Sequence, residues 1–394
     1  MSSLAWIDFD EVERQRARRI MALFQEKDTR DELGLGPIRD SISDHLFPGT
    51  STIQTRLRYM LFVPWIYSMV EEVNSPPDRL TEIARAHEIR LIDALRAGGE
   101  DEGIIGRDAG ASLQRLASSI YWAGLRSWGI RLFPGSQEAY FSALPSLRRR
   151  QHRGGSSEDA LVAEDRDLAT WRSGLPPRPQ DLLERVDFRL TRDEAGFLID
   201  RLIDSRPNNL LTHLAKARRP AKCDYIWTHP DLAAFPDTAR RLVEHAEVFS
   251  AAMLGAALLY NLMLAELRER EDWIERYRDD LANWADRLDL TAVASWSLDD
   301  FWFGVEHENH RVREPARLFV RRWRELVVEQ RGEIADTPAA RDLVRSRETR
   351  LKGPQSRFVN STVRDRWGGR SGTDRIAFRW REASSHIRDL ADAD

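Results

Sequence analysis

The sequence predicts a mostly α-helical protein with two helical lobes. Amphipathic segments with a repeat near 3.6 residues recur along the 394-residue chain, bounded by capping residues, glycines or prolines. The apolar stretch VFSAAMLGAALLYNLMLA, at 248–265, has no polar face, which is typical of a helix buried in a core. Strand-like alternation is limited to a short β element near the C-terminus, IAFRW at 376–380.

The first predicted lobe spans residues 1–150 and begins with short helical segments. Pro37 is well placed as the first residue of a short helix, because proline suits the first helical position. The next segment, FPGTSTIQTRLRYMLFVPWIY at 47–67, is apolar at almost every position of its second half. We therefore expect a buried helix that begins near Thr52, with only its N-terminal end at the surface.

The rest of this lobe also has helical patterns. Residues 80–95 place apolar side chains on one stripe. Residues 103–136 then give a short helix, a second helix capped by Ser118 or Ser119, a glycine and an extended stretch. This is the order of a helix-turn-helix followed by a wing, so the lobe has a winged-helix-like interpretation. Generic packing of a small helical bundle gives the same pattern, and both interpretations stay open.

A polar linker is predicted at residues 151–174, next to the proline-rich stretch SGLPPRPQ. The second lobe, residues 175–394, contains a capping box formed by Thr191 and Glu194. Helical patterns continue through 240–290 and beyond. The end of this lobe is rich in arginine, glycine and tryptophan. The thirteen tryptophans of the chain are expected to anchor the core or an interface.

Charge is distributed unevenly along the chain. The net charge is −4, which alone argues against nucleic-acid binding, and 56 of the 60 basic residues are Arg. Residues 104–153 carry a net charge of +6 and residues 341–382 a net charge of +7, which leaves −17 on the rest. Segregated basic segments on an acidic protein are one footprint of phosphate binding. The alternative is that they are solvated faces or pack against the acidic remainder of the chain.

The first group of candidate anion-binding residues surrounds the expected helix start near residue 52. Its members are Thr50, Ser51, Thr52, Arg56 and Arg58. Unpaired backbone N–H groups and the helix dipole attract an anion at such a position. The alternative is ordinary capping, with the two arginines paired to acidic neighbours such as Asp40 or Asp44.

Further candidates lie in the two basic segments. Arg126 and Arg131 belong to the first of them. The second contributes Arg364, Arg366, Arg370 and Arg375, which are interleaved with Trp367 and two glycines. Arginine bonds phosphate in a bidentate manner, and glycine lets a backbone approach a ligand closely. We therefore expect this second set to form a phosphate-contacting surface.

Signatures of catalysis are missing from the sequence. It has no phosphate-binding G-x-x-x-x-G-K-[ST], no G-x-G-x-x-G after a strand and no H-E-x-x-H. The single Cys223 excludes an intramolecular disulfide framework and a multi-cysteine zinc site. Glu306, His307 and His310 form a weak metal candidate. We expect no cofactor and lean toward a protein that is not an enzyme, although an enzyme with an unrecognised metal site stays an alternative.

The expected location is the cytoplasm, without a membrane. The first residues, MSSLAWIDFDEVERQR, lack the basic and then apolar layout of a signal peptide. The apolar stretch at 248–265 contains Ser250, Gly255, Tyr260 and Asn261 and has no basic flank, so a buried helix is expected there.

Four motifs together carry a resemblance to a known family. They are SLAWIDFDE, FPGTSTIQTRLRYMLFVPWIY, SSIYWAGLRSWGI and GAALLYNLMLAE. The chain resembles, over nearly its whole length, a bacterial family of unknown function. The resemblance supplies no activity and no catalytic residue. It implies a place beside genes for helicases and phospholipase-D-like nucleases in antiviral islands.

These observations favour a non-catalytic nucleic-acid-binding or assembly subunit of a prokaryotic antiviral-defence or DNA-processing module. Arginine side chains and helix N-termini would hold DNA while a helicase or nuclease partner does the chemistry. A protein-interaction scaffold without nucleic-acid contact is the first alternative.

Overall fold

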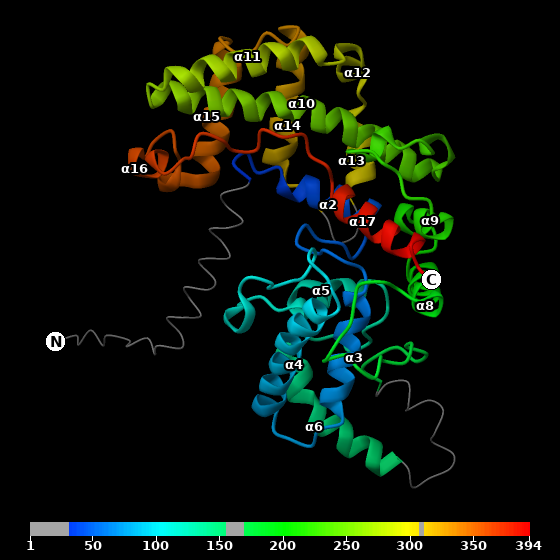
Figure 1. Cartoon of the computed structure of the whole chain (residues 1–394). Helices are drawn as coiled ribbons and strands as arrows, with labels where there is room; N and C mark the ends of the chain where they lie inside the picture. Colours follow the sequence, from blue (N-terminus) through cyan, green and yellow to red (C-terminus); the bar gives the residue numbers. More distant parts are fainter. Residues whose placement is uncertain (1–30, 155–168, 307–310) are drawn as a thin grey trace, which may run out of the picture. The chain divides into compact units, whose positions relative to one another are not determined.

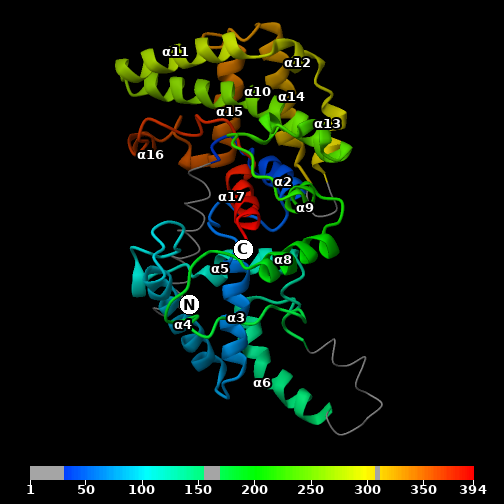
Figure 2. The same ribbon diagram turned by 45° about the vertical axis from the view of Figure 1, so that its right-hand side comes forward.

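The computed structural model describes residues 31–154, 169–306 and 311–394. Within these ranges every regular element is a helix, and no strand occurs, so the prediction of a mostly α-helical protein is confirmed. The one isolated β-bridge described there joins Arg131 to Trp171. Figures 1 and 2 show the helices from two directions.

The chain divides into two compact units. Unit 1 comprises Met1–Ile42 and Leu242–Ile376, and unit 2 comprises Ser43–Arg241 and Ala377–Asp394. Residues 155–168, in the middle of the predicted linker, lie outside the described part of the chain, and the division predicted there stays a prediction. The boundaries of the compact units fall inside the helices α2, Gly36–Leu46, and α10, Asp237–Leu267.

Unit 2 is built around α3, which is buried on nearly all sides. Tyr59 to Tyr67 of this helix are buried without exception, as expected for a segment with no polar face. Helices α3 and α4 lie side by side in both views. The helices of unit 2 are α3 (Tyr59–Glu71), α4 (Pro77–Ala97), α5 (Ala117–Ser127), α6 (Gln137–Gly154), α8 (Arg192–Ser205), α9 (Leu210–Ala217) and α17 (Trp380–Ala391), with 3-10 turns at Gly110–Ser112, Ile226–Thr228 and Leu232–Ala234.

The expected start of α3 near Thr52 was wrong. The helix begins at Tyr59, and its N-cap, Arg58, makes no capping hydrogen bond through its side chain. Thr50 instead donates its hydroxyl to the Phe47 carbonyl at 2.6 Å, just after the end of α2. Local capping preference alone could not distinguish these two uses of a threonine, because both satisfy a backbone group nearby.

The start of α5 is capped by a residue from another helix. Its N-cap is Leu116, which has no capping side chain, so neither Ser118 nor Ser119 plays the expected role. Glu88 of α4 accepts hydrogen bonds from the backbone N–H and the hydroxyl of Ser118, at 2.8 and 2.6 Å. A carboxylate at a helix N-terminus satisfies unpaired donors and interacts favourably with the dipole.

Unit 1 is built around α10. By length and composition this helix could cross a membrane, yet 78% of its most apolar window is buried inside the protein. Leu258 and Leu262 are 4% and 0% exposed, which confirms the prediction of a buried helix at 248–265. The other helices of unit 1 are α11 (Glu271–Arg287), α12 (Leu290–Ser295), α13 (Leu298–Val305), α14 (Glu314–Glu329), α15 (Pro338–Lys352) and α16 (Ser361–Asp365), with a 3-10 turn at Gly353–Gln355.

Tryptophans of two neighbouring helices form hydrogen bonds to the backbone of α10. The indole N–H groups of Trp284 in α11 and Trp323 in α14 donate to the carbonyls of Ala251 and Ala252, both at 2.8 Å. Such a bond satisfies the polar atom of a large apolar side chain. Gly255 makes room for this packing, because a Cβ atom there would lie 2.4 Å from the Trp284 ring. The expectation that tryptophans anchor the core holds for both residues.

A polar network connects the two segments of the chain that form unit 1. Arg357 donates to Glu32 at 2.6 Å, and to Tyr260 and Ser371, each at 3.1 Å. Burial raises the pKa of Glu32, and the neighbouring Arg357 and Lys352 oppose this shift. The side chain of Arg357 is only 13% exposed, and its several acceptors compensate for the loss of water.

The β element expected at 376–380 is absent. Phe378 and Arg379 have positive φ angles of 49° and 62°, which a strand cannot accommodate, and Trp380 is the first residue of α17. Alternation over five residues is too short a signal to distinguish a strand from a tight turn that enters a helix.

We predict opposite effects for two glycine-to-alanine substitutions. Gly255→Ala should lower the free energy of unfolding by about 1–3 kcal/mol, because its methyl group meets the Trp284 ring. Gly196→Ala, in α8, should raise it by about 0.5–1 kcal/mol, because no atom beyond its chain neighbours and the backbone of its own helix lies within 4 Å of the new methyl group. Thermal and urea denaturation would measure both, and equal changes in the two variants would contradict the packing assigned to Gly255.

We also predict a pH-dependent stability contribution from Glu88. Burial raises the pKa of this carboxyl from 4.5 to about 7, although both Ser118 donors oppose the shift. Between these values the folded protein binds more protons than the unfolded chain. The contribution of Glu88 is therefore complete below pH 4.5 and falls, by on the order of 3 kcal/mol, as the pH rises through 7. The difference in unfolding free energy between the wild type and Glu88→Gln should follow this curve, and a difference that is constant from pH 4 to 8 would contradict it.

Candidate functional site

The first group of anion-binding candidates lies in unit 2, between α2 and α3. Thr50 is buried, Ser51 is half-buried and Thr52 is exposed. Because α3 begins seven residues after Thr52, these hydroxyls do not flank the helix N-terminus. The structure therefore separates the three residues from the backbone donors that were expected to bind an anion with them.

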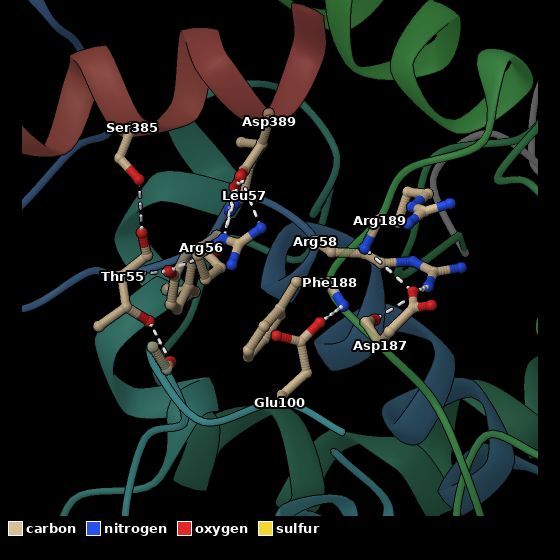
Figure 3. Close-up of polar contacts among 12 residues, drawn as sticks. Thr55, Arg56, Leu57, Arg58, Glu100, Asp187, Phe188, Arg189, Ser385 and Asp389 are labelled. Carbon is tan, nitrogen blue, oxygen red and sulfur yellow. Dashed lines mark hydrogen bonds and ion pairs between the residues drawn. The ribbon is translucent and has the colours of Figure 1, made fainter. Parts of the chain in front are cut away.

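Arg56 is held by a carboxylate from α17. Its guanidinium contacts Asp389 at 3.0 Å through Nε and at 2.9 Å through Nη2 (Figure 3). The other oxygen of Asp389 accepts the backbone N–H of Leu57 at 2.7 Å. Burial raises the pKa of Asp389, whereas the Leu57 N–H and Arg56 lower it.

Arg58 is enclosed even more completely. It donates two hydrogen bonds to Glu194, at 3.0 and 2.8 Å, and one each to the carboxylate and the backbone carbonyl of Asp187, at 3.0 and 2.9 Å. The side chains of Arg58 and Glu194 are only 7% and 5% exposed. Glu194 also completes the capping box with Thr191, which confirms that prediction and fixes the carboxylate for its bond to Arg58.

The ion-pair partners of these arginines differ from those named as the alternative. Asp40 pairs with Arg39, and Asp44 pairs with Arg379. The partners in the structure lie more than 100 residues from Arg56 and Arg58 in the sequence. Proximity in the sequence was therefore a poor guide to the partner.

The pocket beside Arg56 is acidic. It measures about 650 Å³. Arg56 and Arg189 are its two basic residues, against five carboxylates. The carboxylates are Glu100, Asp187, Asp389, Asp392 and Asp394. This excess of negative charge disfavours an anionic ligand.

Arg126 and Arg131 form hydrogen bonds to backbone carbonyls of α5 and of the loop that follows it. Arg131 is 4% exposed and donates to the carbonyls of Trp122 and Gly135, at 3.2 and 3.1 Å. Its guanidinium lies over the Trp122 ring, 4.4 Å from the centroid. Burial lowers the pKa of Arg131 to about 10. Arg126 donates to the Leu132 carbonyl at 2.5 Å. Both side chains thus have structural partners within α5 and the loop that follows it.

The C-terminal candidates divide into two sets. Arg364 donates to the Arg357 carbonyl at 3.0 Å, and Arg366 is exposed. Neither lines the pocket that contains the other two, Arg370 and Arg375. The structure therefore brings together half of the arginines expected to form one phosphate-contacting surface.

Arg370 and Arg375 line a pocket of about 670 Å³ in unit 1. Helix α11 runs beside α10 in both overall views and supplies two further arginines, Arg276 and Arg287. The complete lining is Ala251, Leu254, Leu258, Arg276, Tyr277, Asp280, Asn283, Trp284, Arg287, Leu288, Arg370, Thr373, Asp374 and Arg375. Four arginines therefore face two carboxylates, and an apolar wall from α10 lies behind them.

Gly369 positions the loop that forms one side of this pocket. Its φ angle is +86°, and a Cβ atom there would lie 2.7 Å from the Trp273 ring. Its carbonyl accepts hydrogen bonds from Arg276 at 2.9 Å and from Tyr277 at 2.5 Å. The glycine expected to approach a ligand thus approaches an indole ring, and this contact sets the position of the next residue, Arg370.

Three of the four arginines of this pocket are exposed and can meet a ligand: Arg276, Arg287 and Arg370. Arg370 pairs with Asp374, but the two side chains are 63% and 79% exposed, and such a pair is weak. Arg276 lies over the Tyr277 ring, 4.6 Å from its centroid. Arg276 and Arg287 are exposed, in contrast with Arg58 and Arg131.

Sequence reasoning missed Arg276 and Arg287. They are eleven residues apart, and the intervening Asp280 and Asn283 complete a 4-3-4 spacing that puts all four on one face of a helix. Residues 240–290 were recognised as helical, so the polar side of α11 could have been identified from this spacing. Its meeting with the loop at 370–375 could not, because about 90 residues separate them.

The weak metal candidate falls partly outside the described residues, which do not include His307 and His310. Glu306 forms an ion pair with Arg317 and accepts the Val312 N–H at 3.1 Å. Arg317 lowers the pKa of Glu306. In the part of the chain that is described, no group of three His, Cys, Asp or Glu residues is arranged to hold a metal ion.

We predict that Arg58 stabilises unit 2. Arg58→Met should lower the free energy of unfolding by about 3–5 kcal/mol, because it leaves the buried Glu194 carboxylate without its cation. Arg79→Gln is the control. Arg79 and Glu82 are about two-thirds exposed, so this change should cost less than about 0.5 kcal/mol. Urea denaturation would compare the two, and a small loss in both would show that Arg58 is dispensable.

Comparison with known proteins gives one match. No curated protein and no solved structure matches the chain. The model of one family matches residues 1–394, in agreement with the resemblance carried by the four motifs. The chain therefore belongs to DUF6361, a family of unknown function.

Proposed function

We propose that this protein is a non-catalytic nucleic-acid-binding subunit that holds phosphates with the arginine pocket of unit 1. The observation that carries the proposal is the convergence of four arginines on one pocket. Arg276 and Arg287 come from α11, and Arg370 and Arg375 come from the loop before residue 376. Segments about 90 residues apart in the sequence thus contribute like charges to the same place.

Physical chemistry supports phosphate as the ligand of this pocket. Like charges repel, so a cluster of guanidinium groups with only two carboxylates is stabilised when an anion binds. Arginine presents a planar set of donors that matches two phosphate oxygens at once. The exposed positions of Arg276, Arg287 and Arg370 leave these donors accessible from solvent.

The setting of this function is also part of the proposal. A DNA-binding subunit without its own chemistry would act with a helicase or nuclease in the cytoplasm, within an antiviral-defence or DNA-processing module. The winged-helix-like interpretation of residues 103–136 belongs here too. The turn at Gly129 after α5 and the extended stretch that pairs with Trp171 support its second half. The short helix expected before α5 is only the three-residue 3-10 turn Gly110–Ser112, which weakens its first half.

A protein-interaction scaffold stays the second candidate because of three exposed apolar side chains of unit 1. Phe303 is 89% exposed, Val359 66% and Leu318 50%. Exposed apolar side chains mark a partner interface where they form one contiguous patch. Co-purification of a partner after nuclease treatment would favour this candidate.

We predict that the triple variant Arg276→Gln, Arg287→Gln, Arg370→Gln binds nucleic acid at least about tenfold more weakly at ~50 mM salt. If each arginine neutralises one phosphate of a single strand, the slope of log affinity against log salt should become shallower by about 2. Gel shift or fluorescence anisotropy at several salt concentrations would measure both quantities. Arg375 is left unchanged because it donates to the Glu247 carbonyl at 3.1 Å and helps to hold its loop.

A matched variant controls for the loss of three positive charges. Arg313, Arg321 and Arg350 are exposed arginines of unit 1 that do not line the pocket. Changing these three to glutamine should preserve most of the affinity and slope. Equal losses in both triple variants would reject the pocket as the binding site, and the absence of any salt-dependent binding by the wild type would reject the proposed function.

A further inference from the structure

We infer that the arginine pocket of unit 1 takes an unpaired nucleotide, so the protein binds single-stranded nucleic acid in preference to duplex. This inference rests on the proposed function and specifies its ligand class. It draws on the concave shape of the site, on its apolar wall and on the way Arg276 is held.

The shape of the site favours a ligand that enters it. A pocket of about 670 Å³ lies within the usual range of roughly 300–1,000 Å³ for sites that enclose a small ligand. Duplex DNA presents phosphates on a convex surface with its bases stacked inside, and proteins read it by inserting a helix or strand into a groove. A recessed arginine cluster suits the opposite arrangement, in which an unstacked nucleotide projects from the nucleic acid into the protein.

The wall of the pocket suits a base. Ala251, Leu254 and Leu258 of α10 line it, together with Trp284 of α11. Leu254 is half-buried, so part of its apolar surface still faces solvent. A simple phosphate site needs no such wall, because a phosphate group has no apolar surface to bury. A nucleotide has both an anionic group and an apolar face.

Arg276 is positioned to contact both parts of a nucleotide. The Tyr277 ring lies 4.6 Å from its guanidinium carbon, and the Gly369 carbonyl accepts one of its N–H groups at 2.9 Å. These contacts restrict the side chain while leaving it exposed. Bases splayed out of single strands stack on arginine guanidinium planes as well as on aromatic rings. Arg370, which follows Gly369 directly, is then available for the phosphate.

Asn283 provides a way to fill the pocket without a change of charge. It is exposed, lies on α11 and lines the pocket beside Trp284. Ala282, the preceding residue, is also exposed but does not line the pocket. Asn283→Trp should occupy the space of the nucleotide, and Ala282→Trp places the same side chain on another face of the same helix.

The test measures anisotropy with a labelled single strand and with a duplex of the same length and sequence, for both DNA and RNA. The wild type and Ala282→Trp should bind one or both single strands at least tenfold more tightly than the corresponding duplex. Asn283→Trp should lose this preference, with unchanged melting temperature and duplex affinity. Equal affinity for single strand and duplex, or a preference that survives in Asn283→Trp, would overturn the inference while leaving the arginine-dependent binding intact. Failure of the wild type to bind either form would instead reject the proposed function itself.

Discussion

Unit 2 depends on the burial of Arg58 among carboxylates. A guanidinium group that is 7% exposed has lost nearly all of its water, and this loss is tolerable only because Glu194 and Asp187 surround it with charge-assisted hydrogen bonds. The same few residues fix other elements. Glu194 caps α8, and the neighbouring Arg56 and Leu57 hold Asp389 of α17. The segment just before α3 is thus the place where three distant parts of unit 2 are joined.

The two units show that an arginine-rich composition serves two purposes. Arg58 and Arg131 are buried and the side chain of Arg357 is 13% exposed, and all three are enclosed by carboxylates, hydroxyls or backbone carbonyls of the protein itself. The arginines of the unit 1 pocket are exposed or half-buried and converge without an equal number of acids. The distinction lies in burial and in the acceptors nearby, not in residue type, which is why charge counting along the chain could not separate them.

Features encoded within a few residues could be predicted from the sequence. The burial of α10 follows from a run without a polar face, and the capping box at Thr191 follows from a three-residue spacing. Features that join distant segments could not be predicted. Asp389 for Arg56 and Arg276 beside Arg370 are matters of tertiary packing. The predicted start of α3 was wrong for a related reason. A threonine can cap a helix or bond a nearby carbonyl, and tertiary contacts decide which of these it does.

Each unit is built from two separate segments of the chain, and this has a consequence for biosynthesis. Arg56 and Asp389 are 333 residues apart, and Glu32 and Arg357 are 325 apart. Neither ion pair can close until most of the polypeptide has left the ribosome, and contacts of such long range are slow to form. Early segments such as α3 therefore emerge with charged groups unpaired and apolar surface uncovered. The contacts that complete both units therefore form late in synthesis.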